Sequence, residues 1–228
     1  MTTIYYTLCK QLPQAEYEKA VSMLPENMQR RIVKYRRWQD AHSYLYGRLL
    51  LKEGMFRLGY NFSLGSMQKN QYGKPYFADG PFAFNISHSG EYVVCVISTD
   101  EQEHLGIDIE KIRPIVLDDF SSVLTSQEKK EIDSYDKFYT YWTRKEAIVK
   151  ADGRGLHIPL STIDATKLLV KLNGVQYHLS NIDIDKEYIL HIASLTKIEI
   201  VHTVNFLPVI NTIGHHQNDS GRLMLVND

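Results

Sequence analysis

Apolar residues recur at helical spacing in three stretches of the chain. The pattern predicts a helix over residues 15–23, a longer helix over 28–58, and a third over about 138–151. Gly153 and Gly155 follow the third stretch, where glycine commonly ends a helix. These helices are long enough to cover a sheet.

Strict alternation of apolar and polar residues predicts strands in both parts of the chain. The expected strands cover residues 1–8, 82–87, 92–98, 105–110, 168–172, 175–179, 188–193 and 198–206. Asn173-Gly174 suits a type I′ turn between two of them. We expect the last four strands to form one antiparallel set and the polar residues 211–228 to be a loose tail.

Each half of the chain thus offers a long helix and several strands, which indicates an α+β fold. Pro114 and the acidic pair Asp118-Asp119 interrupt the pattern after the strand 105–110. We therefore expect an N-terminal α+β half over residues 1–110 and a C-terminal α+β half over 111–228 that includes the tail.

Composition and charge narrow the classes of partner. Hydrophobic residues make up 43% of the 228 residues, and 26 basic side chains stand against 27 acidic ones, for a formal net charge of −1. The balance gives no overall field that would draw nucleic acid or a membrane surface. No apolar run approaches the ~20 residues that span a bilayer, and residues 1–8 lack a signal-peptide pattern. We expect a cytoplasmic protein.

Two short segments carry the candidate chemistry. In Gly106–Glu110 the strand alternation puts Asp108 and Glu110 on one face, opposite Ile107 and Ile109. In Trp142–Lys150 the helical spacing puts Glu146 and Lys150 one turn apart on one face. Three carboxylates are suitable ligands for Mg²⁺, which prefers oxygen donors and often shares them with a substrate phosphate.

A plainer interpretation applies to each segment alone. Asp108 and Glu110 could be the solvent face of an edge strand, and Glu146 and Lys150 an ordinary surface ion pair worth about 0.3–0.5 kcal/mol. Spacing within one segment does not decide between a metal site and these alternatives. A metal site requires that the two segments lie close together in the folded protein.

Four motifs in a fixed order carry a resemblance to a known family. They are Gln71-Tyr72-Gly73-Lys74-Pro75, Phe84-Asn85-Ile86-Ser87-His88-Ser89, Gly106-Ile107-Asp108-Ile109-Glu110 and Trp142-Thr143-Arg144-Lys145-Glu146-Ala147-Ile148-Val149-Lys150. Together they resemble the phosphopantetheinyl transferases of the large monomeric, surfactin-synthesis type. The resemblance implies two similar α+β halves related by a pseudo-twofold axis, with the active site in the cleft between them.

The resemblance also implies an activity. Members of this family move the 4′-phosphopantetheine arm of coenzyme A onto a serine of an apo acyl or peptidyl carrier protein, with Mg²⁺, and release 3′,5′-ADP. By this likeness Asp108, Glu110 and Glu146 hold the metal, and Lys150 contacts the phosphate under attack. Glu146 or Glu128 accepts the serine proton. We expect a monomer with coenzyme A as co-substrate.

Coenzyme contacts follow from the same resemblance. The turn Gly73-Lys74-Pro75 is expected against the adenine, and Ser87 and His88 against the coenzyme phosphates. The 3′-phosphate is expected to meet basic residues before the long helix, of which Arg31 falls at a family position. Counting back from Asp40, Met28 occupies another position that is basic in the family.

Two other functions use the same residues. A metal-dependent phosphodiesterase or nuclease would place a water where the carrier serine attacks. A coenzyme-binding or carrier-binding module would have the pocket without the chemistry, although the intact carboxylates and Lys150 argue against it. The near-neutral charge disfavours a nucleic-acid substrate.

Overall fold

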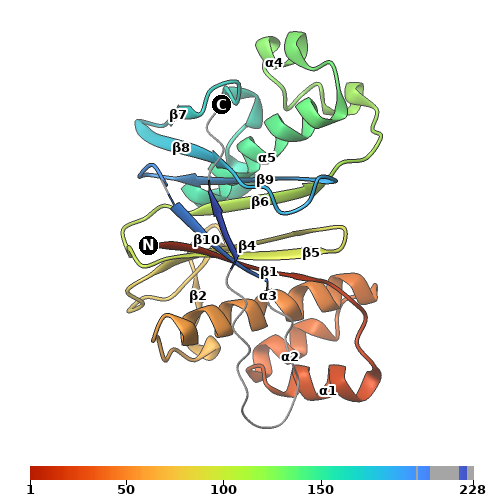
Figure 1. Ribbon diagram of the computed structural model, residues 1–228, viewed down its shortest axis with the longest axis vertical. Coiled ribbons are helices and arrows are strands. Elements are labelled where there is room, and N and C mark those ends of the chain that lie inside the picture. The colour runs from red at the N-terminus through yellow and green to blue at the C-terminus, as the bar shows by residue number, and fades with distance from the viewer. Residues whose placement is uncertain (199, 206–220, 225–228) are drawn as a thin grey trace.

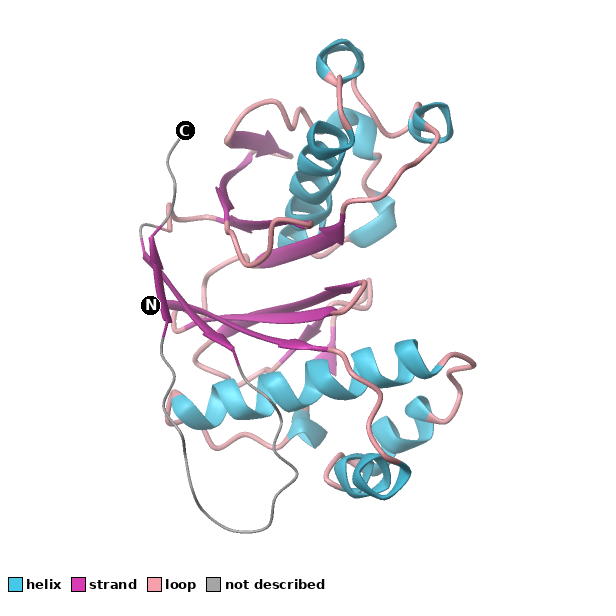
Figure 2. Cartoon of the chain, turned by 45° about the vertical axis from the view of Figure 1, so that its right-hand side comes forward, coloured by secondary structure: helices cyan, strands magenta, loops and turns pink. Residues whose placement is uncertain are grey.

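In the computed structural model, four layers follow one another: helices, a five-stranded sheet, a four-stranded sheet and a second layer of helices (Figures 1 and 2). The structure describes residues 1–198, 200–205 and 221–224. The expected α+β class is confirmed. None of the helices within these residues combines the length and apolar character needed to cross a membrane.

The first sheet has the strand order β11-β10-β1-β5-β4. Its strands are β1 (Thr2–Leu8), β4 (Ala83–Ser89), β5 (Tyr92–Ser98), β10 (Ile200–Asn205) and β11 (Gly221–Met224). The helices on its outer face are α1 (Gln14–Ser22), α2 (Glu26–Ile32) and α3 (Trp38–Arg57). A short ribbon of β2 (Gln68–Lys69) and β3 (Pro75–Tyr76) follows, after the 3₁₀ turn η1 (Leu64–Ser66).

The second sheet has the order β6-β9-β8-β7 and is antiparallel throughout. Its strands are β6 (Gly106–Lys111), β7 (Leu169–Leu172), β8 (Val175–Asn181) and β9 (Tyr188–Ser194). The helices α4 (Ser126–Glu131) and α5 (Tyr135–Asp152) lie on its outer side. Single 3₁₀ turns occur at η2 (Leu117–Phe120), η3 (Gly155–His157) and η4 (Leu160–Thr162).

Strand alternation explains the layering. On β1, Ile4 faces the second sheet and packs with Ile107 and Ile109 of β6, whereas Tyr5 joins the cluster under α3. Close approach of α3 depends on Gly54, where an added Cβ would lie 2.5 Å from Ile97 Cδ1. One apolar face of each sheet therefore meets the other sheet, and the opposite face meets helices.

The Asn173-Gly174 hairpin confirms the predicted type I′ geometry. Both residues have positive φ, 49° and 86°, and they join β7 to β8. The type I′ turn requires positive φ at both central positions, which Asn and Gly tolerate best.

The long helix expected over residues 28–58 is two helices. A turn at residues 33–37 separates α2 from α3, with Val33 as the C-cap of α2. The separation lets Met28 and Ile32 of α2 turn into the core beneath α3. The N-cap of α4 is Thr125, which forms a capping box with Glu128.

The destination of the last expected strand also differs from the prediction. β10 leaves the C-terminal set and pairs in parallel with β1, so it completes the first sheet. Gly221–Met224 pairs with β10 as β11, which contradicts the expected loose tail there. The rest of the expected tail lies outside the described residues. The expected boundary after residue 110 would put β6 with the first half, whereas β6 pairs with β9 of the second sheet.

Candidate functional site

A cavity of about 320 Å³ opens between the two sheets. The residues lining it come from β4, β6 and α5. They are Ile86, Ser87, His88, Asp108, Glu110, Trp142, Glu146 and Lys150. The structure thus brings together the strand segment and the helix segment that the sequence singled out, and Ser87 and His88 join them.

Side chains of β4 bind the free backbone edge of β6. Asn85 Oδ1 accepts from Ile107 N at 3.0 Å, Ser87 Oγ from Ile109 N at 3.4 Å, and Ser89 Oγ from Lys111 N at 3.1 Å. An unpaired strand edge normally needs another strand or solvent. Here three alternating polar side chains take that place, so the two sheets meet at a fixed register. We call these contacts the side-chain ladder.

The side-chain ladder also orients the two strand carboxylates. Ser87 Oγ donates to Asp108 Oδ1 at 3.0 Å, and Ser89 Oγ donates to Glu110 Oε2 at 2.6 Å. Each serine hydroxyl therefore accepts a backbone N–H with its lone pair and gives its hydrogen to a carboxylate. The acids of β6 are held toward the cavity rather than toward bulk solvent.

Lys150 joins the carboxylate pair from α5. Its Nζ lies 2.5 Å from Asp108 Oδ1, 2.9 Å from Ser87 Oγ and 3.2 Å from the Ile107 carbonyl oxygen. The side chain of Asp108 is 5% exposed, and that of Lys150 is 27% exposed. The surface alternative is therefore wrong for Asp108, and Lys150 pairs with this strand residue rather than with Glu146.

The three carboxyl groups influence one another. Burial raises the pKa of Asp108, while the adjacent Lys150 ammonium and two hydrogen bonds oppose that shift. Burial also raises the pKa of Glu110 and Glu146, and the Asp108 charge adds to both shifts. A hydrogen bond from Trp142 helps to hold Glu110. Three like charges in a partly desolvated wall favour a cation between them.

The donor set is chemically suitable for Mg²⁺. Asp108 Oδ2 is buried and has no hydrogen-bond partner, and Glu146 makes no hydrogen bond within the part of the chain that the structure describes. Among the same residues, no three His, Cys, Asp or Glu side chains form a group that could hold a metal ion by themselves. The carboxylate oxygens thus fit an ion that keeps waters and shares substrate oxygens.

Glu128 lies elsewhere. Its side chain is 0% exposed and pairs with Lys145, also 0% exposed, at 2.8 Å. Its Oε2 accepts from Thr125 N in the capping box of α4, and its Oε1 accepts from Ala165 N at 2.8 Å. The structure does not bring Glu128 to the cavity, because α4 and the loop before β7 occupy its carboxylate completely.

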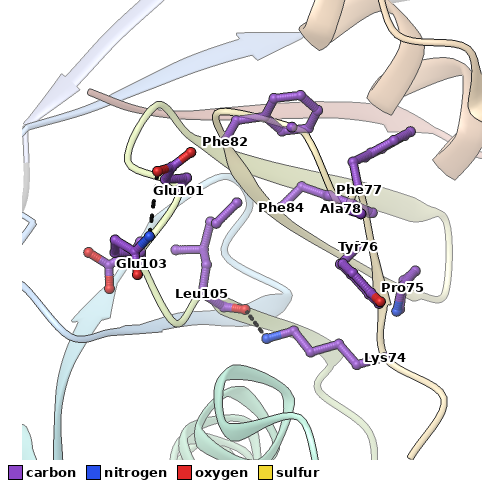
Figure 3. A pocket seen from close by; sticks show the side chains of 13 residues that line it. Lys74, Pro75, Tyr76, Phe77, Ala78, Phe82, Phe84, Glu101, Glu103 and Leu105 are labelled. Carbon is purple, nitrogen blue, oxygen red and sulfur yellow. Dashed lines mark hydrogen bonds between the residues drawn. The ribbon is translucent and has the colours of Figure 1, made fainter. Parts of the chain in front are cut away.

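The expected adenine turn lies beside a second cavity of about 400 Å³, shown in Figure 3. Lys74 and Pro75 line it, and buried Phe82 and Phe84 belong to the same wall. Gly73 precedes them with φ 94°. The Lys74 ammonium points away from solvent and donates to two backbone carbonyls. The positive charge of Lys74 is therefore already bound by backbone carbonyl groups of the protein.

Arg31 stands apart from both cavities. Its guanidinium lies 5.1 Å from the ring centre of Tyr44, and Arg48 lies 4.6 Å from the same ring. Arg31 Nε also donates to Tyr35 at 3.4 Å. Met28 is uncharged and is buried in the core under α3, so it supplies no basic group at that family position.

Comparison with known proteins identifies the family. Residues 12–100 match the family described as 4′-phosphopantetheinyl transferase, N-terminal, and residues 104–195 match the 4′-phosphopantetheinyl transferase superfamily. The 4′-phosphopantetheinyl transferase Sfp of Bacillus subtilis (strain 168) is 32% identical over 160 residues, which cover 66% of this chain and 70% of that protein. The chain belongs to the 4′-phosphopantetheinyl transferases.

Other relatives of the transferase agree. The 4′-phosphopantetheinyl transferase gsp of Aneurinibacillus migulanus is 35% identical over 149 residues, covering 62% of this chain and 61% of that protein. The 4′-phosphopantetheinyl transferase AcpT of Salmonella typhi is 37% identical over 135 residues, covering 54% and 65%. The two family matches meet near residues 101–103, between β5 of the first sheet and β6 of the second.

Sequence reasoning missed three residues that build the transferase site. Asn85 and Ser89 form the outer steps of the side-chain ladder, and Lys145 anchors α5 through Glu128. The first two had a signal, because polar residues alternate through the strand Phe84–Ser89. Lys145 had none, since a lysine on a helix is ordinarily taken as exposed.

Proposed function

We propose that this transferase moves the 4′-phosphopantetheine arm of coenzyme A onto a serine of an apo acyl or peptidyl carrier protein, with Mg²⁺, and releases 3′,5′-ADP. The observation that carries the proposal is the convergence of Asp108, Glu110, Glu146 and Lys150 on one cavity between the sheets. The names of the relatives give the arm that is transferred.

The reaction is a phosphoryl transfer, in which positioning and electrostatic stabilisation do most of the work. The carrier serine oxygen attacks the β-phosphorus of coenzyme A, and the bond to the 3′,5′-ADP oxygen breaks. Lys150 reaches the cavity with its ammonium and offsets charge on the phosphate oxygens. Ser87 and Asp108 hold Lys150 in that position.

Asp108, Glu110 and Glu146 would hold Mg²⁺ through carboxylate oxygens. When bound, the ion would neutralise charge on the diphosphate and on the leaving oxygen. The orphaned Oδ2 of buried Asp108 supports this assignment, since a buried carboxylate oxygen without a partner is costly.

Glu146 is the candidate base for the serine proton. It lines the cavity and makes no hydrogen bond within the described residues, so an oxygen is free to accept. Glu128 is better assigned as a support for α5, because each of its oxygens already accepts a hydrogen bond and Lys145 neutralises its charge.

For the coenzyme, we propose that the backbone of the turn Gly73-Lys74-Pro75 meets the adenine. Ser87 and His88 would meet the phosphates from the end of β4, and Arg31 would meet the 3′-phosphate. A pseudo-twofold relation of the halves is in keeping with one long helix packed on each sheet. We also propose a cytoplasmic monomer.

One reaction tests the proposal. The purified protein is incubated with coenzyme A, Mg²⁺ and an apo carrier protein, and the carrier is weighed by mass spectrometry while 3′,5′-ADP is quantified. Gain of one phosphopantetheine arm, abolished by EDTA and restored by Mg²⁺, is the expected result. Cleaved coenzyme beside an unmodified carrier would instead indicate a phosphodiesterase, and absence of chemistry a binding module.

A further inference from the structure

Lys74 makes a contact that the coenzyme site does not explain. Its Nζ donates to the carbonyl oxygen of Ala151 at 2.8 Å and to that of Leu105 at 3.1 Å. Ala151 lies in the last turn of α5, and Leu105 immediately precedes β6. Figure 3 shows the Lys74 side chain reaching toward Leu105 above the end of a helix. One ammonium therefore bridges the end of α5 and the start of β6.

A second contact from the same turn reinforces the first. Asn70 Nδ2 donates to the Gly153 carbonyl oxygen at 3.1 Å, while its Oδ1 accepts from Tyr72 N and Lys74 N, both at 2.9 Å. Asn70 thus shapes the turn with one end of its amide and holds the end of α5 with the other. We call the contacts of Asn70 and Lys74 with residues 105 and 151–153 the latch.

Close packing leaves the latch little freedom. Gly153 has φ 85°, and a Cβ added there would lie 2.9 Å from Lys74 Cδ. At Gly106 an added Cβ would lie 2.0 Å from the Ala147 carbonyl oxygen, so α5 and β6 already touch through backbone. A cation at the carbonyl end of α5 also lies at the negative end of the helix dipole.

These contacts adjoin the residues of the proposed reaction. Lys150 immediately precedes Ala151, and Glu146 lies about one turn before it on α5. Asp108 lies three residues after Leu105, on β6. We propose that Lys74 is a positioning residue whose ammonium sets the placement of α5 against β6, and so aligns the helix and strand carboxylates. This inference rests on the proposed function.

The backbone and the side chain of Lys74 thus have separate roles. The backbone of the turn remains free to meet the adenine, whereas the ammonium acts through the protein. A displacement of about 1 Å at a phosphoryl-transfer site can cost on the order of 100-fold in rate. Loss of the ammonium is therefore expected to lower kcat for carrier modification about tenfold or more.

The test compares Lys74→Met with Lys69→Met, the same substitution at an exposed lysine on β2. For Lys74→Met we expect the fall in kcat, faster backbone hydrogen exchange over residues 149–157, and a Kd for coenzyme A within about threefold of wild type. Lys69→Met is expected to match wild type in all three. The exchange measurement needs no transfer activity, so it remains informative even if the wild-type protein fails to modify a carrier.

Chemical rescue adds a readout that a merely structural role would not give. Lys74→Cys treated with 2-bromoethylamine regains a side chain of lysine length that ends in an amine, and kcat should recover. Wild type treated in parallel controls for Cys9 and Cys95, which are both buried. Asn70→Asp serves as a second variant if Lys74→Met fails to fold. It keeps the turn-forming oxygen but removes the donor to Gly153, and it should show a smaller fall in kcat with faster hydrogen exchange over the same residues.

Three results would overturn the inference. Unchanged kcat with faster exchange would make the latch structural only. Unchanged exchange with weaker binding of coenzyme A would make the ammonium a direct coenzyme contact. Unchanged kcat and exchange would leave the latch without any role.

Discussion

Helix α5 carries two lysine–carboxylate pairs that differ in almost every respect. Lys145 and Glu128 are both sealed from solvent, and Lys145 Nζ also donates to the carbonyl oxygens of Leu160 and Ile163 at 2.8 and 2.6 Å. Lys150 and Asp108 border a cavity, and Asp108 Oδ2 has no hydrogen-bond partner among the residues that the structure describes. One pair is complete within the protein and the other is not.

The difference distinguishes an ion pair that supports the fold from an ion pair that lies at the candidate functional site. A buried ion pair is tolerated when every oxygen and hydrogen has a partner, and it then fixes a register at little net gain in stability. A pair that leaves one carboxylate oxygen without a hydrogen-bond partner, beside two further carboxylates, favours the binding of a ligand.

The largest expected effect comes from breaking the sealed pair. Lys145→Met leaves Glu128 buried without its cation, so the free energy of unfolding should fall by about 3–5 kcal/mol. Denaturant unfolding followed by circular dichroism and by tryptophan fluorescence measures it. Lys129→Met, at an exposed position on α4, is the matched control and should change stability by less than about 0.5 kcal/mol.

A double substitution sharpens this result. In Glu128→Met with Lys145→Met both charges are gone, so most of the lost stability should return, apart from about 1 kcal/mol for the lost capping box. Equal losses in the single and double variants would mean that the pair is not the source of the effect.

The second effect concerns the open pair. Asp108→Ala and Glu146→Ala should each lower transfer by about 100-fold or more, because each removes a carboxylate that is proposed to hold Mg²⁺. Stability should change far less than in Lys145→Met. Carrier mass shift against time gives the rate, and unfolding curves give the stability. Full activity in either variant would contradict the carboxylate site.

A third effect tests the side-chain ladder. Ser89→Ala leaves the Lys111 N–H without its acceptor and removes one of the donors to Glu110, so stability should fall by about 1 kcal/mol and transfer should weaken. Ser66→Ala removes an exposed hydroxyl that donates to a carbonyl, and serves as the control. Identical unfolding curves for the two variants would show that β6 does not need the ladder.

The last effect depends on pH, is small near pH 6.5, and comes from His191. Burial lowers its pKa well below the usual value, and Arg144 beside it adds to the shift. Arg144 Nε donates to Nε2 at 3.2 Å and Nδ1 faces Thr143 Oγ1 at 2.8 Å, so the folded protein holds the neutral ring. The unfolded state binds the extra proton below about pH 6.5.

Stability should therefore fall as pH drops below about 6.5, with a slope of at most about 1.4 kcal/mol per pH unit from this group. His191→Gln should reduce that slope in unfolding curves recorded from pH 7.5 to 5. A slope equal to that of wild type would assign the acid sensitivity to other groups.

Local pattern predicted most strands and the shared faces of the site residues. Alternation in Gly106–Glu110 correctly put Asp108 and Glu110 opposite two core isoleucines, because a strand has a fixed period of two. The break between α2 and α3 was missed, since residues 33–37 contain neither Gly nor Pro. Helical periodicity continues across such a turn and hides it.

Contacts between segments that are distant along the chain could not be predicted from the sequence. Nothing near Lys74 indicates that its ammonium binds carbonyls 31 and 77 residues away. Glu128 was expected as a candidate acceptor of the serine proton, and its pairing with Lys145 depends on how α4 packs on α5. Local rules describe one element at a time, whereas these roles arise between elements.

The parallel pairing of β1 with β10 has a consequence for biogenesis. Residues 2–6 find this neighbour only at residues 201–205, and both strands lie outside the stretches 12–100 and 104–195 that the family comparisons match. During synthesis β1 lacks its β10 neighbour until residues 201–205 have left the ribosome. Closure of the first sheet thus reports that the second half has been made.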